Sequence, residues 1–147
     1  MLDSLANDLL SQLNWKVVMP TSTPKPAPSR ILCVEDDADY REVLRLLLEQ
    51  DGYEVVTADG FEEALRSINA GRFDLYILDR KYNDGDGTEL CRQLCETNEN
   101  VPIIFLSGFV SDSDVQKAMN AGARAYLGKP VSYEILQDTL ERLLSAS

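Results

Sequence analysis

Acidic, hydroxyl and amine side chains stand at the ends of short apolar runs, in a combination that could act on phosphate. The residues that follow these runs are Glu35 and Asp36 after 31–34, Asp79 after 75–78, Ser107 after 103–106 and Lys129 after 125–127. Three carboxylates at one place repel one another unless a cation is bound, and Mg²⁺, which prefers carboxylate and water ligands, is the natural one. A carboxylate nucleophile with a metal, a hydroxyl and an ammonium group forms a phosphoryl-transfer site, where positioning and charge neutralisation supply most of the catalysis.

The elements that must position these residues follow from the periodicity of the chain after Arg30. Apolar runs predict strands, and helical spacing of apolar residues predicts helices between them. The expected strands are 31–34, 53–57, 75–78, 103–106 and 125–127, and the expected helices are 38–50, 60–70, 87–96, 112–121 and 132–145. Such alternation predicts an α/β fold with a doubly wound parallel sheet that is covered on both faces. Ligands of such sheets bind beyond the carboxyl ends of the strands, where the acids are expected to meet.

Composition excludes several classes of function. The chain has 147 residues, which allows one main domain, and a net charge of −11, which argues against direct nucleic-acid binding. The absence of histidine excludes a Ser-His-Asp triad and a phosphohistidine in this chain. Three cysteines without a CxxC pair favour neither a disulfide framework nor a zinc site. No apolar run is long enough to span a bilayer and the first residues do not resemble a secretory signal, so a cytoplasmic location is expected.

Residues 1–29 differ from residues 30–147, and we expect a boundary between them. Leucines 2, 5, 9 and 13 predict a short amphipathic helix, and the proline-rich stretch 20–29 predicts an extended linker. A helix of this length is marginal alone in water. It could pack on the following domain, on a second copy in a weak homodimer or on a partner, or it could be a dispensable tail.

Four motifs in joint spacing resemble the receiver domain of bacterial two-component response regulators, over residues 30–146. They are the segment Ile31–Asp37, Asp79 followed by Gly87, the pair Ser107-Gly108 and the segment Gly122–Pro130. The resemblance implies a flavodoxin-like receiver fold, with five parallel strands in the order 2-1-3-4-5 and five helices.

The resemblance also implies a metal site. Asp36 would bind Mg²⁺ or Mn²⁺ directly and Glu35 would bind it through water. The phospho-acceptor Asp79 and the backbone carbonyl of Lys81 would complete the protein ligands. Asp37, which the same motif contains, is expected instead to cap the next helix.

The remaining roles concern the phosphoryl group. By resemblance, Asp79 would accept it from the phosphohistidine of a sensor histidine kinase or of a histidine phosphotransfer protein. Ser107 would donate a hydrogen bond to it, Lys129 would pair with it and Tyr126 would change rotamer with it. A cis peptide bond is expected before Pro130.

Two residues depart from the family's pattern. The family usually has a hydrophobic residue directly after the acceptor and a proline four residues after it, where this chain has Arg80 and Asn83. Lys81 adds a second cation at the rim of the site. These departures leave open a constitutive interaction module with little phosphate turnover. A free-standing phosphatase, which would hydrolyse an external phosphomonoester, is a further alternative.

The function implied by the resemblance is a phosphorylation-controlled switch that catalyses only its own phosphorylation and dephosphorylation. Because the last predicted helix ends near residue 147, we expect output by protein contact rather than through a following effector domain. The expected output surface comprises the fourth helix, the fifth strand and the fifth helix, and its partner is unknown. Transfer of the phosphate to a phosphotransfer protein is the alternative output. No contact with nucleic acid or membrane is expected.

Overall fold

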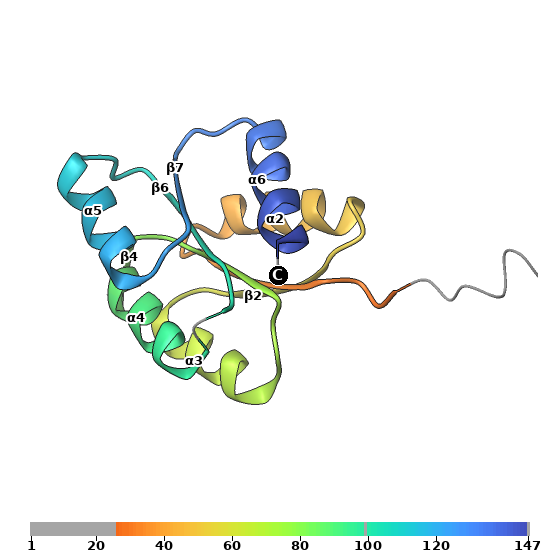
Figure 1. The fold of residues 1–147 in the computed structure, drawn as a ribbon, viewed down its shortest axis with the longest axis horizontal. Coiled ribbons are helices and arrows are strands. Elements are labelled where there is room, and N and C mark those ends of the chain that lie inside the picture. Colours follow the sequence, from red (N-terminus) through yellow and green to blue (C-terminus); the bar gives the residue numbers. More distant parts are fainter. Residues whose placement is uncertain (1–25, 99, 147) are drawn as a thin grey trace, which may run out of the picture.

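The computed structural model describes residues 26–98 and 100–146, so the predicted N-terminal helix lies outside the described residues. Strands and helices alternate along this part of the chain, except that two short strands directly follow the third strand (Figure 1). The strands are β1 (Arg30–Val34), β2 (Glu54–Ala58), β3 (Leu75–Leu78), β4 (Lys81–Tyr82), β5 (Gly85–Asp86), β6 (Ile103–Ser107) and β7 (Ala125–Gly128). The helices are α2 (Ala38–Gln50), α3 (Phe61–Ala70), α4 (Gly87–Thr97), α5 (Asp112–Ala121) and α6 (Tyr133–Ser145). The predicted bounds of the five long strands and five helices agree with these to within one residue.

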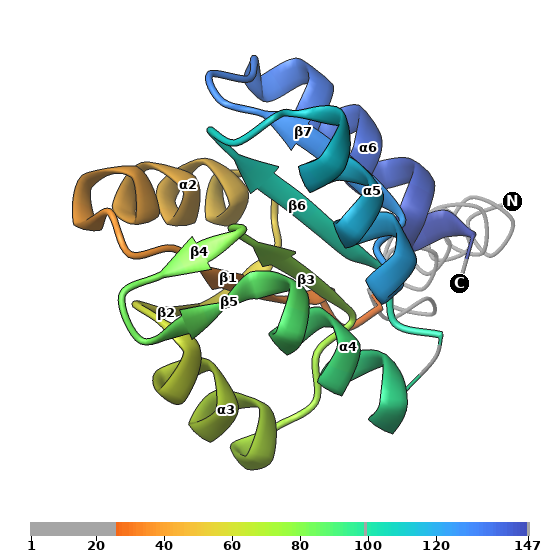
Figure 2. The ribbon, with the colours of Figure 1, turned by 90° about the vertical axis from the view of Figure 1, so that its left-hand side faces the viewer.

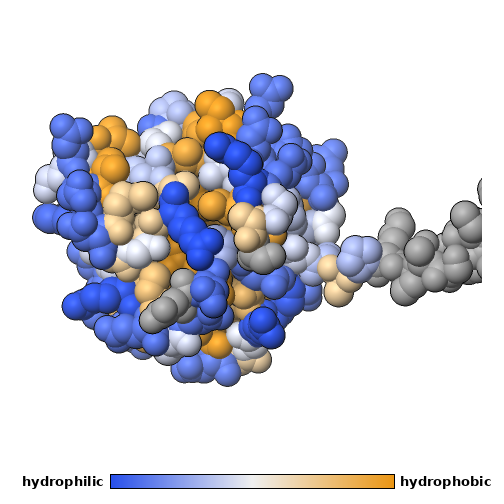
Figure 3. Space-filling view, viewed as in Figure 1, coloured by the Kyte–Doolittle hydropathy of each residue, from blue (hydrophilic) through white to orange (hydrophobic). Residues whose placement is uncertain are grey.

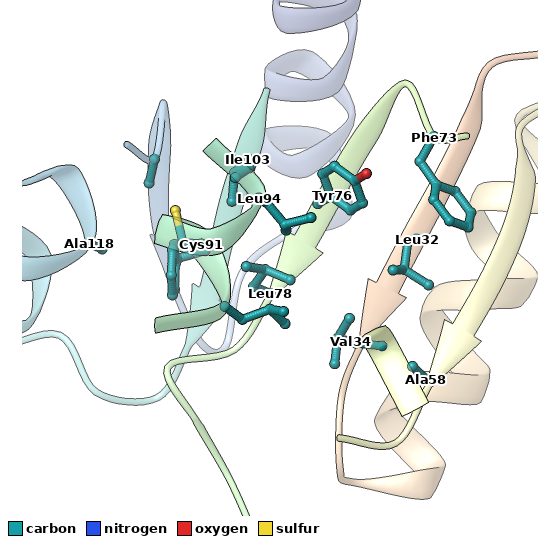
Figure 4. Close-up of a cluster of buried hydrophobic side chains, with 14 of the residues drawn as sticks. Leu32, Val34, Ala58, Phe73, Tyr76, Leu78, Cys91, Leu94, Ile103 and Ala118 are labelled. Atoms are coloured by element: carbon teal, nitrogen blue, oxygen red, sulfur yellow. The ribbon is translucent and has the colours of Figure 1, made fainter. Parts of the chain in front are cut away.

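The main sheet contains five parallel strands in the order β2-β1-β3-β6-β7, as the doubly wound prediction requires. Side chains of β1 alternate between two apolar cores, since successive residues of a strand point to opposite faces. Leu32 and Val34 belong to the core under α3, α4 and α5, and Ile31 and Cys33 to the core under α2 and α6 (Figures 2 and 4). β3 and β6 are buried along their whole length because helices cover both faces.

Capping residues define the ends of the helices, and so the positions of the loops that join them to the strands. The Asp37 side chain caps α2 by accepting hydrogen bonds from the backbone N–H groups of Asp39 and Tyr40, as predicted. Gly122 ends α5 with a φ of 115°, a left-handed conformation that favours glycine. The cis peptide bond between Lys129 and Pro130 is also present as predicted.

The acceptor loop after β3 contains an element that the sequence analysis did not predict, with Asp84 in its turn. β4 and β5 form a two-stranded antiparallel hairpin in which Lys81 lies opposite Asp86 and Tyr82 opposite Gly85. Strands of two residues carry no periodic signal, so this hairpin could not be predicted from apolar spacing.

The surface in Figure 3 is mainly hydrophilic, with separate apolar patches. All three cysteines lie in the described part of the chain and are free, which agrees with the expectation that they form no disulfide framework. Burial raises the pKa of the Cys33 thiol to about 12, so it is an inert apolar side chain. Within residues 26–98 and 100–146, no helix has the length and apolar character needed to cross a membrane.

Candidate functional site

Three carboxylates meet at the carboxyl ends of β1 and β3. Ligand atoms of Glu35, Asp36 and Asp79 all lie within 4.8 Å of one another. Glu35 and Asp79 are buried, whereas Asp36 is exposed to solvent. The parallel topology brings these residues together, as their places after two neighbouring strands predicted. An oxygen-only donor set that is open on one side fits Mg²⁺, which binds few carboxylates and keeps several waters.

A pocket of about 260 Å³ opens beside these acids. It is lined by Asp36, Asp59, Gly60, Asn83 and Asp84. Solvent and small ions therefore reach the exposed carboxylate Asp36 from the side of β2 and of the β4–β5 hairpin.

Lys129 extends from the end of β7 into the carboxylate cluster. Its Nζ donates hydrogen bonds to Glu35 Oε2 at 2.7 Å and to Asp79 Oδ2 at 2.9 Å. Burial alone would lower the pKa of Lys129, but its hydrogen bonds to these two carboxylates outweigh burial and raise the pKa. Lys129 is therefore a permanent cation here. Burial raises the pKa of Glu35, and the hydrogen bond from Lys129 opposes that rise.

Ser107 ends β6 and is fully buried beside Lys129. Ser107 lies opposite Gly128 in the sheet, and the backbone N–H of Lys129 donates to the Ser107 carbonyl at 2.8 Å. The Ser107 hydroxyl accepts a hydrogen bond from the backbone N–H of Phe109 at 3.2 Å. The predicted hydroxyl and ammonium groups are thus held on neighbouring strands at the same edge of the sheet.

Tyr126 connects β7 with the segment that follows Ser107. Its ring stacks on that of Phe105 with the centroids 5.7 Å apart, and its hydroxyl donates to the Phe109 carbonyl. Burial raises the pKa of the Tyr126 hydroxyl, which stays protonated and available as a donor. A change of rotamer, the predicted role of Tyr126, would break this contact with residue 109.

The main chain around Asp79 is tightly packed against the start of α4. A Cβ atom on Gly87 would lie 1.8 Å from the Asp79 carbonyl oxygen, and the Gly87 N–H donates to the Arg80 carbonyl at 2.7 Å. Any side chain at position 87 would force either Asp79 or the start of α4 to shift. This close approach is the physical reason for the glycine eight residues after Asp79.

Asn83 stands where the family usually has proline, and other contacts hold the loop. The Asp84 carboxylate accepts hydrogen bonds from the backbone N–H groups of Phe61 at 2.8 Å and Glu62 at 3.0 Å. It thereby caps α3, whose own N-cap residue Gly60 has no side chain to do so. The N–H groups of Glu62 and Phe61 lower the pKa of Asp84. The tip of the β4–β5 hairpin is thus attached to a neighbouring helix.

Tyr82 makes the contact that the sequence prediction missed. Its buried hydroxyl accepts a hydrogen bond from the backbone N–H of Asp79 at 2.6 Å and donates to the Val34 carbonyl at 3.2 Å. The only signal in the sequence is an aromatic residue among the polar residues of the acceptor loop.

The two cations predicted at the rim of the site have different partners. Arg80 Nε forms an ion pair with Asp114 Oδ1 on α5 at 2.5 Å. Lys81 Nζ lies 5.6 Å from the centroid of the Phe109 ring. Arg80 is therefore directed toward α5. The predicted metal contact of the Lys81 carbonyl stays a prediction, as do the individual roles of the other site residues.

Comparison with known proteins gives the same family from sequence and from structure. The model of the response regulator receiver domain family matches residues 31–141. Response regulator MprA of Mycolicibacterium vanbaalenii is 41% identical over 117 residues, which are 80% of this chain and 51% of MprA. Transcriptional regulatory protein ZraR of Salmonella typhimurium is 34% identical over 115 residues, which are 78% of this chain and 26% of ZraR. The chain thus spans about half the length of MprA and about a quarter of that of ZraR.

Solved structures resemble the whole of the sheet and its helices. A CheY-like response regulator receiver domain protein of Methanospirillum hungatei superposes with a TM-score of 0.78 at 33% identity, covering 81% of this chain and 95% of that one. Chemotaxis protein CheY4 of Vibrio cholerae superposes with a TM-score of 0.75 at 31% identity, covering 80% and 99%. Together with the match over residues 31–141, these likenesses show that the chain belongs to the response regulator receiver domain family.

Proposed function

We propose that this chain is a phosphorylation-controlled switch of a two-component phosphorelay. The observation that carries the proposal is the position of Lys129 Nζ between the carboxylates of Glu35 and Asp79. A carboxylate oxygen of Asp36 lies within 4.8 Å of an oxygen of each of these two groups. Family membership supplies the general function, signal transduction by phosphorelay. Asp79 is the proposed acceptor of the phosphoryl group.

The proposed reaction is a single nucleophilic displacement at phosphorus, which the charged groups of the site assist. A carboxylate oxygen of Asp79 attacks the phosphorus of a phosphohistidine, a P–O bond forms and the P–N bond to the imidazole breaks. The Lys129 ammonium and the Ser107 hydroxyl neutralise charge on the oxygens of the transferred group. The chain would act only on its own phosphoryl group and would not be an enzyme for external substrates.

Receiver domains generally bind Mg²⁺ at an acidic pocket, and the residues present fit that ion or Mn²⁺. Asp36 and Asp79 would bind it directly, Glu35 through water, and the Lys81 carbonyl would complete the set. The ion would supply positive charge that brings together two anions, the phosphodonor and the acceptor.

The proposed partners are a sensor histidine kinase or a histidine phosphotransfer protein on the input side and a protein on the output side. Family membership supports both classes of partner. The output surface would comprise α5, β7 and α6, since Tyr126 and Arg80 connect the site with β7 and α5. We place this activity in the cytoplasm, and the acidic charge argues against direct contact with nucleic acid.

The second candidate is a constitutive receiver-like interaction module with little phosphate turnover. The observation in its favour is the ion pair between Arg80 and Asp114, which joins the acceptor loop to α5 without any phosphate. A loop already attached to the output helix could present one fixed surface.

Phosphorylation of the full chain by acetyl phosphate and Mg²⁺ separates the two candidates. Intact mass spectrometry should find one added phosphate on the wild-type protein and none on Asp79→Asn. Asp59→Asn, which changes an exposed acid at the same edge of the sheet, is the matched control and should be labelled like the wild type. Equal labelling of Asp79→Asn would move the acceptor elsewhere, and no labelling of the wild-type protein would favour the constitutive module.

A further inference from the structure

The Tyr82 hydroxyl lies between the main chains of β1 and β3 at the place where their pairing ends. The paired residues are Ile31 with Leu75, Leu32 with Tyr76 and Cys33 with Ile77. Continuing this register by one residue directs the Val34 carbonyl toward the N–H of Asp79. Instead, the Tyr82 hydroxyl accepts from the Asp79 N–H at 2.6 Å and donates to the Val34 carbonyl at 3.2 Å. One side-chain hydroxyl therefore replaces the next step of the ladder.

This bridge joins the two strand ends that carry the chemistry. Val34 directly precedes Glu35, and Asp79 is the acceptor in the proposed function. Within residues 26–98 and 100–146, the other contacts of Asp79 do not attach its main chain to β1. Its Oδ1 accepts from the Arg80 N–H at 2.6 Å, its Oδ2 from Lys129, and its carbonyl faces Gly87. The Tyr82 hydroxyl thus joins the Asp79 main chain to the Val34 main chain.

The hydroxyl is suited to this role because it is enclosed and neutral. Only 7% of Tyr82 is exposed, and its ring packs in the core beneath α3, α4 and α5. As a neutral phenol, the hydroxyl accepts from the Asp79 N–H and has its own proton to donate to the Val34 carbonyl. Without the hydroxyl, two buried backbone groups would lose their hydrogen-bond partner.

We propose that Tyr82 is a positioning residue for the phosphorylation of Asp79. It holds the main chain of Asp79 at a fixed separation from β1. The Asp79 carboxylate therefore keeps its distance from the carboxylates of Glu35 and Asp36. This role rests on the proposed function, because it concerns the same phosphoryl transfer. Tyr82 touches neither phosphate nor metal and acts through the backbone of Asp79.

The test compares Tyr82→Phe with Tyr76→Phe in the full chain. Tyr76 is a matched control, since it also has 7% exposure, belongs to the same core and lies on β3. Each variant loses one hydroxyl and keeps its ring. The rate of phosphorylation by acetyl phosphate should fall about tenfold in Tyr82→Phe and stay near that of the wild type in Tyr76→Phe. The Mg²⁺ concentration at half-maximal rate should rise in Tyr82→Phe alone, because the three carboxylates are no longer held in register.

A spectroscopic measurement distinguishes positioning from core filling. In wild-type protein the Asp79 amide proton should exchange slowly with solvent, and in Tyr82→Phe it should exchange faster and change its chemical shift. A wild-type rate and Mg²⁺ dependence in folded Tyr82→Phe would overturn the role of Tyr82. Rapid exchange of the Asp79 amide in the wild-type protein would overturn it even if Tyr82→Phe did not fold. By contrast, wild-type protein that takes no phosphate at all would overturn the proposed function, whatever the amide measurement finds.

Discussion

Arg80 and Asp114 form an ion pair, with 2.5 Å between Nε and Oδ1, that attaches the residue after Asp79 to the first turn of α5. The side chains are only 12% and 16% exposed, so solvent screens the pair less than it screens a surface pair. The Arg80 guanidinium also lies 5.9 Å from the Phe109 ring centroid. The acceptor loop, the segment after Ser107 and α5 are therefore in mutual contact.

Replacing Asp114 with Asn should make the free energy of unfolding less dependent on pH in the acid range. The Ser111 hydroxyl and the Arg80 guanidinium hold the pKa of Asp114 below its ordinary value, so folding favours its ionised form. That stabilisation is present above the pKa of the unfolded side chain, about 3.9, and is lost as pH falls toward the lower folded pKa. Urea midpoints measured from neutral to acid pH should fall less steeply in Asp114→Asn than in the wild type. Asp112→Asn, in the same helical turn, is the control, and parallel curves for all three proteins would contradict the expectation.

Metal binding should depend on Asp36 and not on its neighbour Asp37. Asp36 is the exposed member of the carboxylate cluster, whereas the Asp37 carboxylate is occupied in capping α2. Asp36→Ala should lose Mg²⁺ affinity at least about tenfold without unfolding, because a carboxylate is a preferred ligand of this ion. Asp37→Ala should keep its Mg²⁺ affinity and lose about 1 kcal/mol of unfolding free energy. NMR titration with Mg²⁺ and urea unfolding measure both effects, and the reverse pattern would exchange the roles of the two acids.

A methyl group at position 87 should be costly, and one at position 108 should not. The Cβ of Gly87→Ala would lie 1.8 Å from the Asp79 carbonyl oxygen, whereas a Cβ at Gly108 meets nothing within 4 Å. Gly87→Ala should lower the free energy of unfolding by about 3 kcal/mol, as overpacking against backbone does. Gly108→Ala should stay near the wild type. Equal denaturation midpoints for the two variants would show that the start of α4 moves freely away from Asp79.

Lys129 should couple phosphorylation to the rest of the domain. Its hydrogen bond to Asp79 would be replaced by contact with the phosphoryl group, and its backbone is bonded to Ser107. Lys129→Ala should retain much of the phosphorylation but reduce the chemical-shift changes around Tyr126 and residues 110–121. Lys117→Ala, which removes an exposed amine from α5, is the matched control. Full-sized changes in phosphorylated Lys129→Ala would show that another residue performs the coupling.

The sequence alone determined the five long strands, the five helices and the meeting place of the acids. Continuous apolar runs specify the strands, because strands buried on both faces need apolar residues along their whole length. The helical spacing of apolar residues between these runs specifies the helices. Parallel pairing brings the carboxyl ends of β1 and β3 together, so the sequence predicts that Glu35, Asp36 and Asp79 lie at one site.

Only the tertiary structure decided how the acceptor loop is held. Arg80 pairs with Asp114, Asp84 caps α3 at Phe61, and the Tyr82 hydroxyl bridges to Val34 across 48 positions of sequence. None of these contacts follows from a period of two or of 3.6 residues, because each joins single polar groups on elements that pack against each other. Which donor meets which acceptor depends on side-chain packing in three dimensions, and that information exists only once the sheet and its helices have come together.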